Sequence, residues 1–311
     1  MYNQLHVLGF LDSKLAGSDF YGYPVFHPDI LNQCRPEDIY IFICTTNQKV
    51  YSEIKKICDE RMISNSLLDA AILKLLKQEF LRTTELLDLD SRTIYEELLA
   101  NRAEANTPDD SLFAGESYFG LPSFCRCNPN DIIVDCGAYV GDSAERYIWR
   151  MEQLKKYIAI EPDKGNFHAL QRRFARLREE WNFSEDKLIA LNGGVDETTH
   201  KMYLETRVDG LGSIACKDSD LENGIPFWAI DDLFPNGYTF LKADIESYEY
   251  RMICGAKNSI KKYRPRIAVC IYHNMIDMYS IPQLIHSIDP SYCLSVRHHS
   301  YGYEETVLYA Y

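Results

Sequence analysis

The sequence of 311 residues has no glycine loop of the G-x-G-x-x-G type, which would mark a dinucleotide site. It has no uninterrupted apolar run of bilayer length, and no charged leader followed by an apolar core at its start. Positive charge is scarce, because 33 Lys and Arg stand against 46 Asp and Glu, for a formal charge of -13. These absences argue against a nicotinamide enzyme, a membrane span and a general nucleic-acid binder.

The sequence also lacks the regular cysteine spacings of a small disulfide-bonded protein. The ten cysteines are scattered through the chain and do not frame a disulfide scaffold, so we expect reduced thiols. Cys125-x-Cys127 is the only close pair, and no second pair or nearby histidine completes a zinc site. Reduced thiols and the missing leader together predict a cytoplasmic protein.

One glycine turn is present and informative, in residues 131–142. Ile132 to Asp135 reads as a buried parallel strand, Gly137 and Gly141 let the backbone approach a ligand, and Asp142-Ser143 can cap the following helix. Glu161 closes the next strand, where a carboxylate can accept hydrogen bonds from both ribose hydroxyls. The sequence therefore predicts a nucleoside site.

The residue types at this turn favour S-adenosyl-L-methionine as the nucleoside. Asp135 would repel a pyrophosphate but suits a ligand with a cationic end. Asn192-Gly193 ends the third strand and could contact adenine, or could be an ordinary turn. The predicted cofactor-binding residues are Asp135, Gly137, Ala138, Tyr139, Gly141, Asp142, Glu161, Asn192 and Gly193.

Apolar runs that alternate with helical segments after Asp131 predict an α/β fold, with a mostly parallel sheet between helices. We expect a truncated Rossmann-like module in residues 1–65, a helical connector in 66–110 and the main domain in 111–311. The module lacks the usual first strand and its glycine loop, so docking or homo-oligomer formation is favoured over nucleotide binding.

Lys201 to Glu205 and Phe227 to Ile230 predict an added ribbon. The seven expected strands are Ile132 to Asp135, Tyr157 to Ile160, Leu188 to Leu191, Thr239 to Asp244, Ile267 to Ile271, Cys293 to Arg297 and Thr306 to Tyr309, with the last two as an antiparallel edge hairpin.

A second group of polar residues closes the fourth and fifth strands. Lys242, Asp244 and Glu246 would share one side of an extended strand, facing a crevice or forming a Lys242 to Asp244 ion pair. His273 is the first candidate for a catalytic base and Asp244 the second, with Lys242 keeping Asp244 ionised. Alternatively, Asp244, Glu246 and His273 could bind a divalent cation. Glu249 could begin the next helix.

The chain from Asp131 to Tyr311 resembles the FkbM family of S-adenosylmethionine-dependent methyltransferases. The resemblance implies the seven-stranded class I methyltransferase fold and methyl transfer to oxygen, commonly on sugars, glycolipids or polyketides, so the expected partner is a small-molecule or glycan acceptor. One departure is Glu246-Ser-Tyr-Glu249, where the family often has Glu-Gly, so a non-catalytic cofactor-binding or scaffold protein is the alternative. The resemblance rests on Val134-Asp-Cys-Gly-Ala-Tyr-Val-Gly-Asp142, Ala159-Ile-Glu-Pro162, Gly212-Ser213, Ile230-Asp-Asp-Leu233, Phe240-Leu-Lys-Ala-Asp-Ile-Glu246, Gly255-Ala256, Arg264-Pro-Arg266, Ile271-Tyr-His273, Ile281-Pro282 and Glu305-Thr-Val-Leu-Tyr309.

Overall fold

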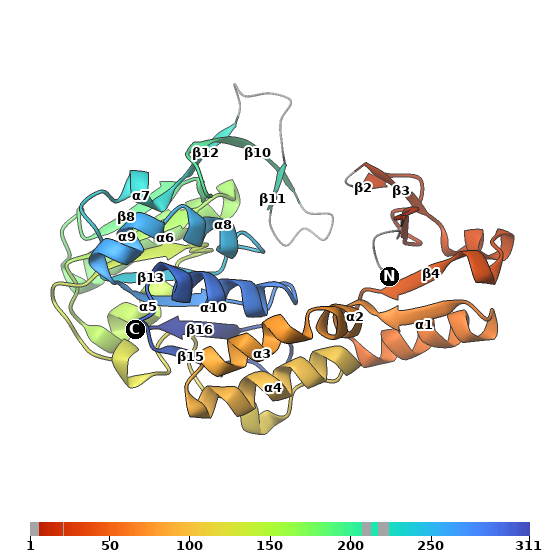
Figure 1. Cartoon of the computed structure of the whole chain (residues 1–311). Coiled ribbons are helices and arrows are strands. Elements are labelled where there is room, and N and C mark those ends of the chain that lie inside the picture. The colour runs from red at the N-terminus through yellow and green to blue at the C-terminus, as the bar shows by residue number, and fades with distance from the viewer. Residues whose placement is uncertain (1–5, 21, 207–212, 217–223) are drawn as a thin grey trace. The chain divides into compact units, whose positions relative to one another are not determined.

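The computed structural model describes residues 6–20, 22–206, 213–216 and 224–311 (Figure 1). The chain divides into two compact units, Met1–Leu68 and Asp69–Tyr311. The three-part division at residues 65 and 110 stays a prediction. No helix among the described residues is both long and apolar enough to cross a membrane.

The first unit contains two small sheets. In one, strands β1 (Phe10–Leu11), β3 (Tyr23–Phe26) and β2 (Asp19–Phe20) lie in that order. In the other, β4 (Tyr40–Ile43) pairs in parallel with β5 (Ser64–Leu67), and helix α1 (Gln48–Glu60) connects them. Short 3-10 helices span Pro28–Gln33 and Pro36–Asp38. The apolar segment from Leu5 to Leu11 is strand only at Phe10–Leu11, and Leu5 lies outside the described residues.

The second unit is built on the predicted seven-stranded sheet, with strand order β15-β16-β14-β13-β6-β7-β8. All pairings are parallel except those of β16, which runs antiparallel between β14 and β15. The expected antiparallel hairpin is therefore present, with β15 rather than β16 at the sheet edge. The strands are β6 (Ile132–Cys136), β7 (Lys156–Glu161), β8 (Leu188–Asn192), β13 (Phe240–Ala243), β14 (Arg266–Cys270), β15 (Leu294–His298) and β16 (Thr306–Ala310).

Helices cover both faces of this sheet because its apolar side chains alternate between them. Ile133 belongs to the buried cluster that includes residues of α5 and α6, whereas its neighbour Val134 belongs to a second cluster that includes residues of α3, α4, α8, α9 and α10. The helices of the unit are α2 (Leu68–Leu75), α3 (Lys77–Leu86), α4 (Leu89–Glu104), α5 (Asp142–Met151), α6 (Lys164–Trp181), α7 (Ile230–Leu233), α8 (Glu249–Cys254), α9 (Lys257–Tyr263) and α10 (Asp277–Ile288), with 3-10 turns at Asp110–Leu112 and Pro122–Phe124.

The predicted connector helices belong to this packing. Three helices, α2 to α4, occupy the predicted helical connector, and α3 packs against α10 while α4 packs against β15. Tyr95 of α4 is fully buried, and its hydroxyl donates a 2.9 Å hydrogen bond to the Met278 carbonyl oxygen. The apolar residues of α3 and α4 thus form a packing face of the second unit.

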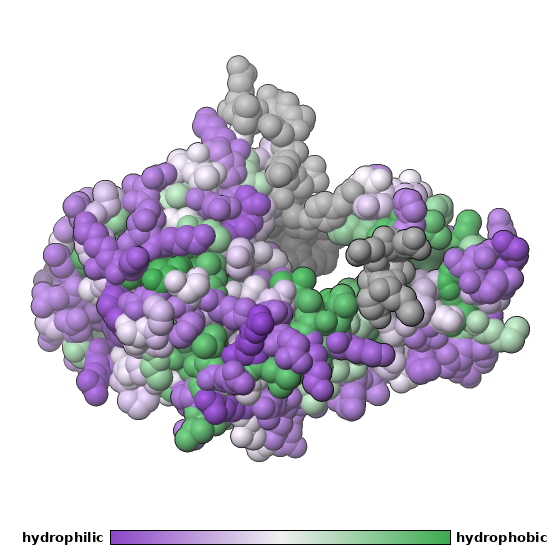
Figure 2. Space-filling view, in the orientation of Figure 1, coloured by the Kyte–Doolittle hydropathy of each residue, from purple (hydrophilic) through white to green (hydrophobic). Residues whose placement is uncertain are grey.

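The added ribbon forms a separate four-stranded sheet in the order β11-β10-β12-β9. Its strands are β9 (Gly194–Val195), β10 (His200–Thr206), β11 (Ser213–Cys216) and β12 (Ile225–Trp228). Figure 2 shows mostly hydrophilic residues on the visible face of the second unit, with apolar residues scattered between them. This agrees with the acidic composition of the chain.

Candidate functional site

A cavity of about 570 Å³ lies where the carboxyl ends of the parallel strands meet. Gly137 follows β6, Glu161 ends β7, Gly193 follows β8, Asp244 follows β13 and Tyr272 follows β14, and all five line the cavity. Ligands of open α/β sheets bind at this edge. The cavity therefore joins the two groups of residues that the sequence singled out separately.

The glycine turn forms one wall of this cavity. Gly137 has φ 74°, and a Cβ atom at this position would lie 1.8 Å from the Asp244 carbonyl oxygen. Glycine is therefore required for the close approach of two strand ends. Tyr139 and Asp142 also line the cavity, whereas Gly141, with φ 82°, precedes α5 and is not part of the lining.

Asp135 does not reach the cavity as a free anion. Its Oδ1 lies 2.9 Å from Lys242 Nζ, and its Oδ2 accepts a 2.8 Å hydrogen bond from Tyr157. Lys242 also donates a 2.8 Å hydrogen bond to the Gly137 carbonyl oxygen. Burial alone would lower the pKa of Lys242, but the carboxylates of Asp135 and Asp244 raise it above its ordinary value. The alternative of a Lys242 to Asp244 ion pair gives way to a Lys242 to Asp135 pair, because Lys242 and Asp135 lie opposite each other in the β13–β6 ladder.

Glu161 is 5% exposed and faces the cavity at the end of β7. Its two carboxylate oxygens accept backbone hydrogen bonds from Tyr139 N at 2.9 Å and Asp163 N at 2.8 Å. Burial raises the pKa of Glu161 to about 7, although these two bonds oppose the shift. The free protein thus holds a carboxyl group that changes charge near neutral pH.

Two other predicted cofactor residues serve the backbone instead of lining the cavity. The Asn192 side chain donates hydrogen bonds to the carbonyl oxygens of Glu161, at 3.0 Å, and Pro162, at 3.2 Å. Ala138 is 1% exposed, and its N–H donates to the Ile160 carbonyl oxygen. Asn192 therefore behaves as a residue of an ordinary turn. Of Asn192 and Gly193, only Gly193 is part of the described cavity lining.

The charged end of β13 is not extended, which corrects the assumption behind its predicted alternation. The strand ends at Ala243, and Glu246 and Ser247 have φ values of 54° and 76°. Lys242, Asp244 and Glu246 nevertheless line the same cavity, since the chain turns around it. Ser247 occupies a left-handed conformation that glycine adopts freely, which gives the departure from the family's Glu-Gly a physical meaning.

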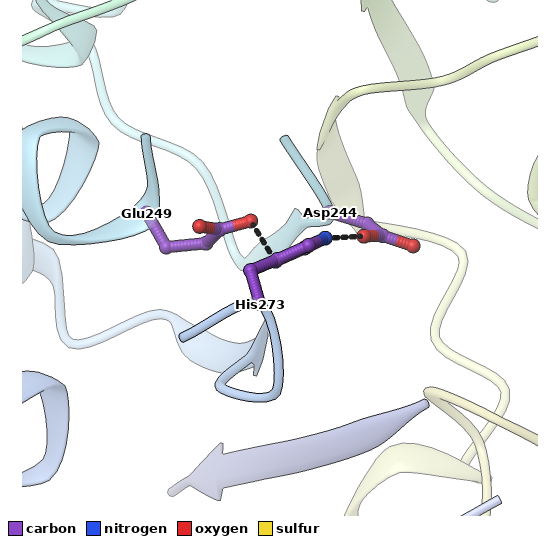
Figure 3. Close-up of side chains that lie close together, drawn as sticks. All are labelled: Asp244, Glu249 and His273. Atoms are coloured by element: carbon purple, nitrogen blue, oxygen red, sulfur yellow. Dashed lines mark ion pairs between the residues drawn. The ribbon is translucent and has the colours of Figure 1, made fainter. Parts of the chain in front are cut away.

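His273 lies between two carboxylates, as Figure 3 shows. Its Nε2 is 3.4 Å from Asp244 Oδ1, and its Nδ1 is 3.1 Å from Glu249 Oε1. Burial would lower the pKa of His273, but these two acids raise it to about 10. The ring is then protonated near neutral pH in the metal-free protein, which counts against the expected neutral base. Glu249 begins α8 as expected, and its Oε1 accepts a 2.7 Å hydrogen bond from Ile245 N.

Asp244 lines the cavity and accepts hydrogen bonds from two tyrosines. Tyr118 donates to Oδ2 at 3.0 Å and Tyr272 to Oδ1 at 3.3 Å. Although burial would raise the pKa of Asp244, His273 and Lys242 hold it well below the ordinary range. Asp244 is therefore a firmly ionised hydrogen-bond acceptor and a weak base.

Sequence reasoning missed Tyr118 and Glu305 as cavity residues. Glu305 lines the cavity, accepts a 3.0 Å hydrogen bond from Ser117, and has its pKa raised by burial and by Asp244. One signal was available for it, because an antiparallel strand such as β16 begins at the edge where parallel strands end. Tyr118 precedes the first strand of the sheet, and no local pattern marks it.

The sheet order, the covering helices and the cavity at the strand ends are those of a class I methyltransferase. A family model described as the methyltransferase FkbM domain matches residues 135–304, which is more than half of the chain. The chain belongs to the FkbM methyltransferase family, as the sequence resemblance predicted.

One solved structure supports this fold. The chain is similar to methyltransferase FkbM from Methylobacillus flagellatus KT, with TM-score 0.64, 21% identity and coverage of 98% of this chain and 83% of that chain. A weaker likeness is to Aeropyrum pernix fibrillarin in complex with S-adenosyl-L-methionine, with TM-score 0.37, 11% identity and coverage of 62% and 71%. No curated protein matches the chain.

Proposed function

We propose that this protein is an S-adenosylmethionine-dependent O-methyltransferase that acts on a hydroxyl of a sugar, glycan or related cell-envelope or secondary metabolite. The observation that carries the proposal is Glu161, a buried carboxyl at the end of β7 that faces the cavity beside the glycine turn. A carboxylate at this position suits the two hydroxyls of a ribose. The cytoplasmic location stays a prediction that rests on the cysteines.

The residues present fit this cofactor. Glu161 has both oxygens positioned by backbone N–H groups and still faces the cavity, so its carboxylate can accept further hydrogen bonds. Tyr139 is 55% exposed beside it and offers a ring for an adenosine to contact. When bound, adenosylmethionine supplies a methyl group on a sulfonium sulfur, which is already an electrophile.

The acceptor side would align a hydroxyl oxygen with that methyl group. Asp244 is fixed by Tyr118 and Tyr272 and can accept a hydrogen bond from the acceptor hydroxyl. Glu305, whose pKa is raised, is the better receiver of the hydroxyl proton. His273 then acts on Asp244 as a positioning residue instead of as the base.

The charges around the cavity favour a neutral, hydroxyl-rich acceptor. Asp244, Glu246 and Glu305 place carboxylates on the acceptor side. Of the two cations in the described lining, Lys242 pairs with Asp135, and Arg146 pairs with Asp142 at 2.6 Å. An anionic acceptor would meet repulsion here without a free cation to offset it.

Calorimetry with adenosylmethionine and transfer of radiolabelled methyl groups to fractionated cell glycans test the proposal. We expect the wild type to bind adenosylmethionine and to transfer label to a glycan fraction. Glu161→Ala should bind adenosylmethionine at least tenfold more weakly, because a hydrogen bond to a charged group is lost. Unchanged affinity in Glu161→Ala would refute the cofactor site. Glu305→Gln should lower kcat while leaving cofactor affinity unchanged.

The alternative, a non-catalytic scaffold, drew its support from the departure Glu246-Ser-Tyr-Glu249. Ser247 is not part of the described cavity lining, although Tyr248 is. Ser247 therefore affects the backbone conformation, whereas Tyr248 of the same departure takes up space at the cavity wall. Cofactor binding without turnover on any cell extract would favour the scaffold.

A further inference from the structure

We propose that Asp244, Glu246 and the Nε2 atom of His273 form a site for a divalent cation, Mg²⁺ or Mn²⁺, and that Glu249 is the positioning residue for the imidazole. The inference rests on the proposed function in one respect: it names a second cofactor of the same cavity. The two carboxylates line that cavity, so a bound cation would be open to an acceptor oxygen.

Carboxylate oxygens of Asp244 and Glu246 both lie near one ring nitrogen of His273. The Nε2 atom of His273 lies 3.4 Å from Asp244 Oδ1 and 3.9 Å from Glu246 Oε2. Two ligands that each bind an ion at about 2.1 Å, at a right angle, are about 3 Å apart. Small side-chain movements therefore bring all three around one ion. Glu246 has the most room to adjust, because its side chain is 71% exposed.

A second observation points to a ligand at this place. The His273 side chain is 6% exposed, yet neither ring nitrogen makes a hydrogen bond of acceptable geometry among the described residues. The neighbouring carboxylates are close enough but do not meet the angle. A buried polar group without such a bond is costly. A cation in front of Nε2 would satisfy it.

A metal-binding histidine usually donates its second ring N–H to a carboxylate, and Glu249 is placed to accept it. Its Oε1 is 3.1 Å from Nδ1 and is held by the 2.7 Å bond from Ile245 N, and its side chain is fully buried. Carboxylates that accept from the far nitrogen of a ligating histidine fix the ring and its tautomer. Figure 3 shows Glu249 and Asp244 on opposite sides of the ring, which leaves one nitrogen for each role.

The donor set selects the kind of cation. Two carboxylates and one imidazole, with no thiolate, suit a hard divalent ion with water or hydroxyl oxygens in its remaining positions. An acceptor hydroxyl bound there would have its pKa lowered by the positive charge. Its proton would pass to Glu305 or to water, and the resulting oxygen would form the C–O bond as the C–S bond breaks and its electron pair stays on sulfur.

The test uses the full chain after chelator treatment and MnCl₂ as the probe. Calorimetry, and the decrease of the electron paramagnetic resonance signal of free Mn²⁺, should show one ion bound per chain. Asp244→Asn and Glu246→Gln should abolish or strongly weaken binding, and Glu249→Gln should weaken it by about 10- to 100-fold. Asp142→Asn is the matched control, because it removes a carboxylate from the cofactor side of the same cavity and should leave Mn²⁺ affinity within about twofold of the wild type.

Circular dichroism separates loss of fold from loss of a ligand. Absence of binding at millimolar Mn²⁺ and Mg²⁺, or equal binding by Asp244→Asn and the wild type, would overturn the site and leave His273 as a protonated link between two acids. Adenosylmethionine binding is measured in parallel without metal. Cofactor binding without Mn²⁺ binding defeats only the metal site, whereas Mn²⁺ binding without cofactor binding defeats only the proposed function.

Discussion

The buried carboxyl of Glu161 makes cofactor affinity depend on pH in a predictable direction. Its pKa is raised to about 7 in the free protein, whereas hydrogen bonds from ribose hydroxyls require the ionised form as acceptor. The free protein is therefore mostly protonated at this position below pH 7, and affinity should rise as pH rises through about 7. Above about pH 8 the group is ionised already, so affinity should level off.

The magnitude follows from the ionised fraction. With a pKa of about 7, roughly 9% of the free protein carries the carboxylate at pH 6 and roughly 91% at pH 8. The dissociation constant should therefore fall about tenfold across this interval, which corresponds to about 1.4 kcal/mol. An ordinary glutamate with a pKa of 4.5 would give no change over the same range.

The assay is calorimetry with 5′-methylthioadenosine, chosen because it keeps the adenine and the ribose hydroxyls but lacks the titrating amino acid of adenosylmethionine. Glu161→Gln is the control, since it removes the titration while keeping the side-chain size. Its affinity should be lower than that of the wild type at pH 8 and flat with pH. Two results would each refute the reasoning: a flat profile for the wild type, or the same slope in Glu161→Gln.

Three further predictions concern stability, measured as the free energy of unfolding in urea. Lys242→Met should cost about 3 to 5 kcal/mol, because it leaves buried Asp135 without its cation, and adding Asp135→Asn should recover part of that loss; no recovery would contradict the pair. Gly137→Ala should cost more than about 2 kcal/mol, because its Cβ would overlap the Asp244 carbonyl oxygen, and an unchanged midpoint would refute this crowding. Ser247→Gly should be neutral or stabilising by up to about 1 kcal/mol, because it relieves a left-handed backbone at φ 76°, and a clear loss would count against strain there.

The strands and the glycine turn could be predicted because their signals are local. Apolar runs of about five residues bounded by polar ones mark β6 and β14, and Glu161 is itself the last residue of a strand. Contacts across the sheet had no such signal. Lys242 faces Asp135 because of the register between β13 and β6, which no spacing within either strand encodes.

The acceptor side was harder for the same physical reason. The charge on His273 depends on Glu249, and the two meet only when α8 packs beside the end of β14. Asn192 was misleading because a polar side chain at a strand end can bond to the neighbouring strand as readily as to a ligand. Sequence therefore located the strand ends, and tertiary packing decided which side chains face the cavity.

The pairing of Lys242 with Asp135 has a consequence for how the protein folds. Strands β6, β7 and β8 follow one another along the chain, but the cation that neutralises Asp135 comes from β13, and it bonds to Gly137 across 105 residues. A partly folded state with only the first three strands in place would hold a buried carboxylate without its partner, which is unfavourable. Strands β6, β7 and β8 should therefore not form before β13 joins them, and the sheet should form in one slow, cooperative step set by long-range strand pairing.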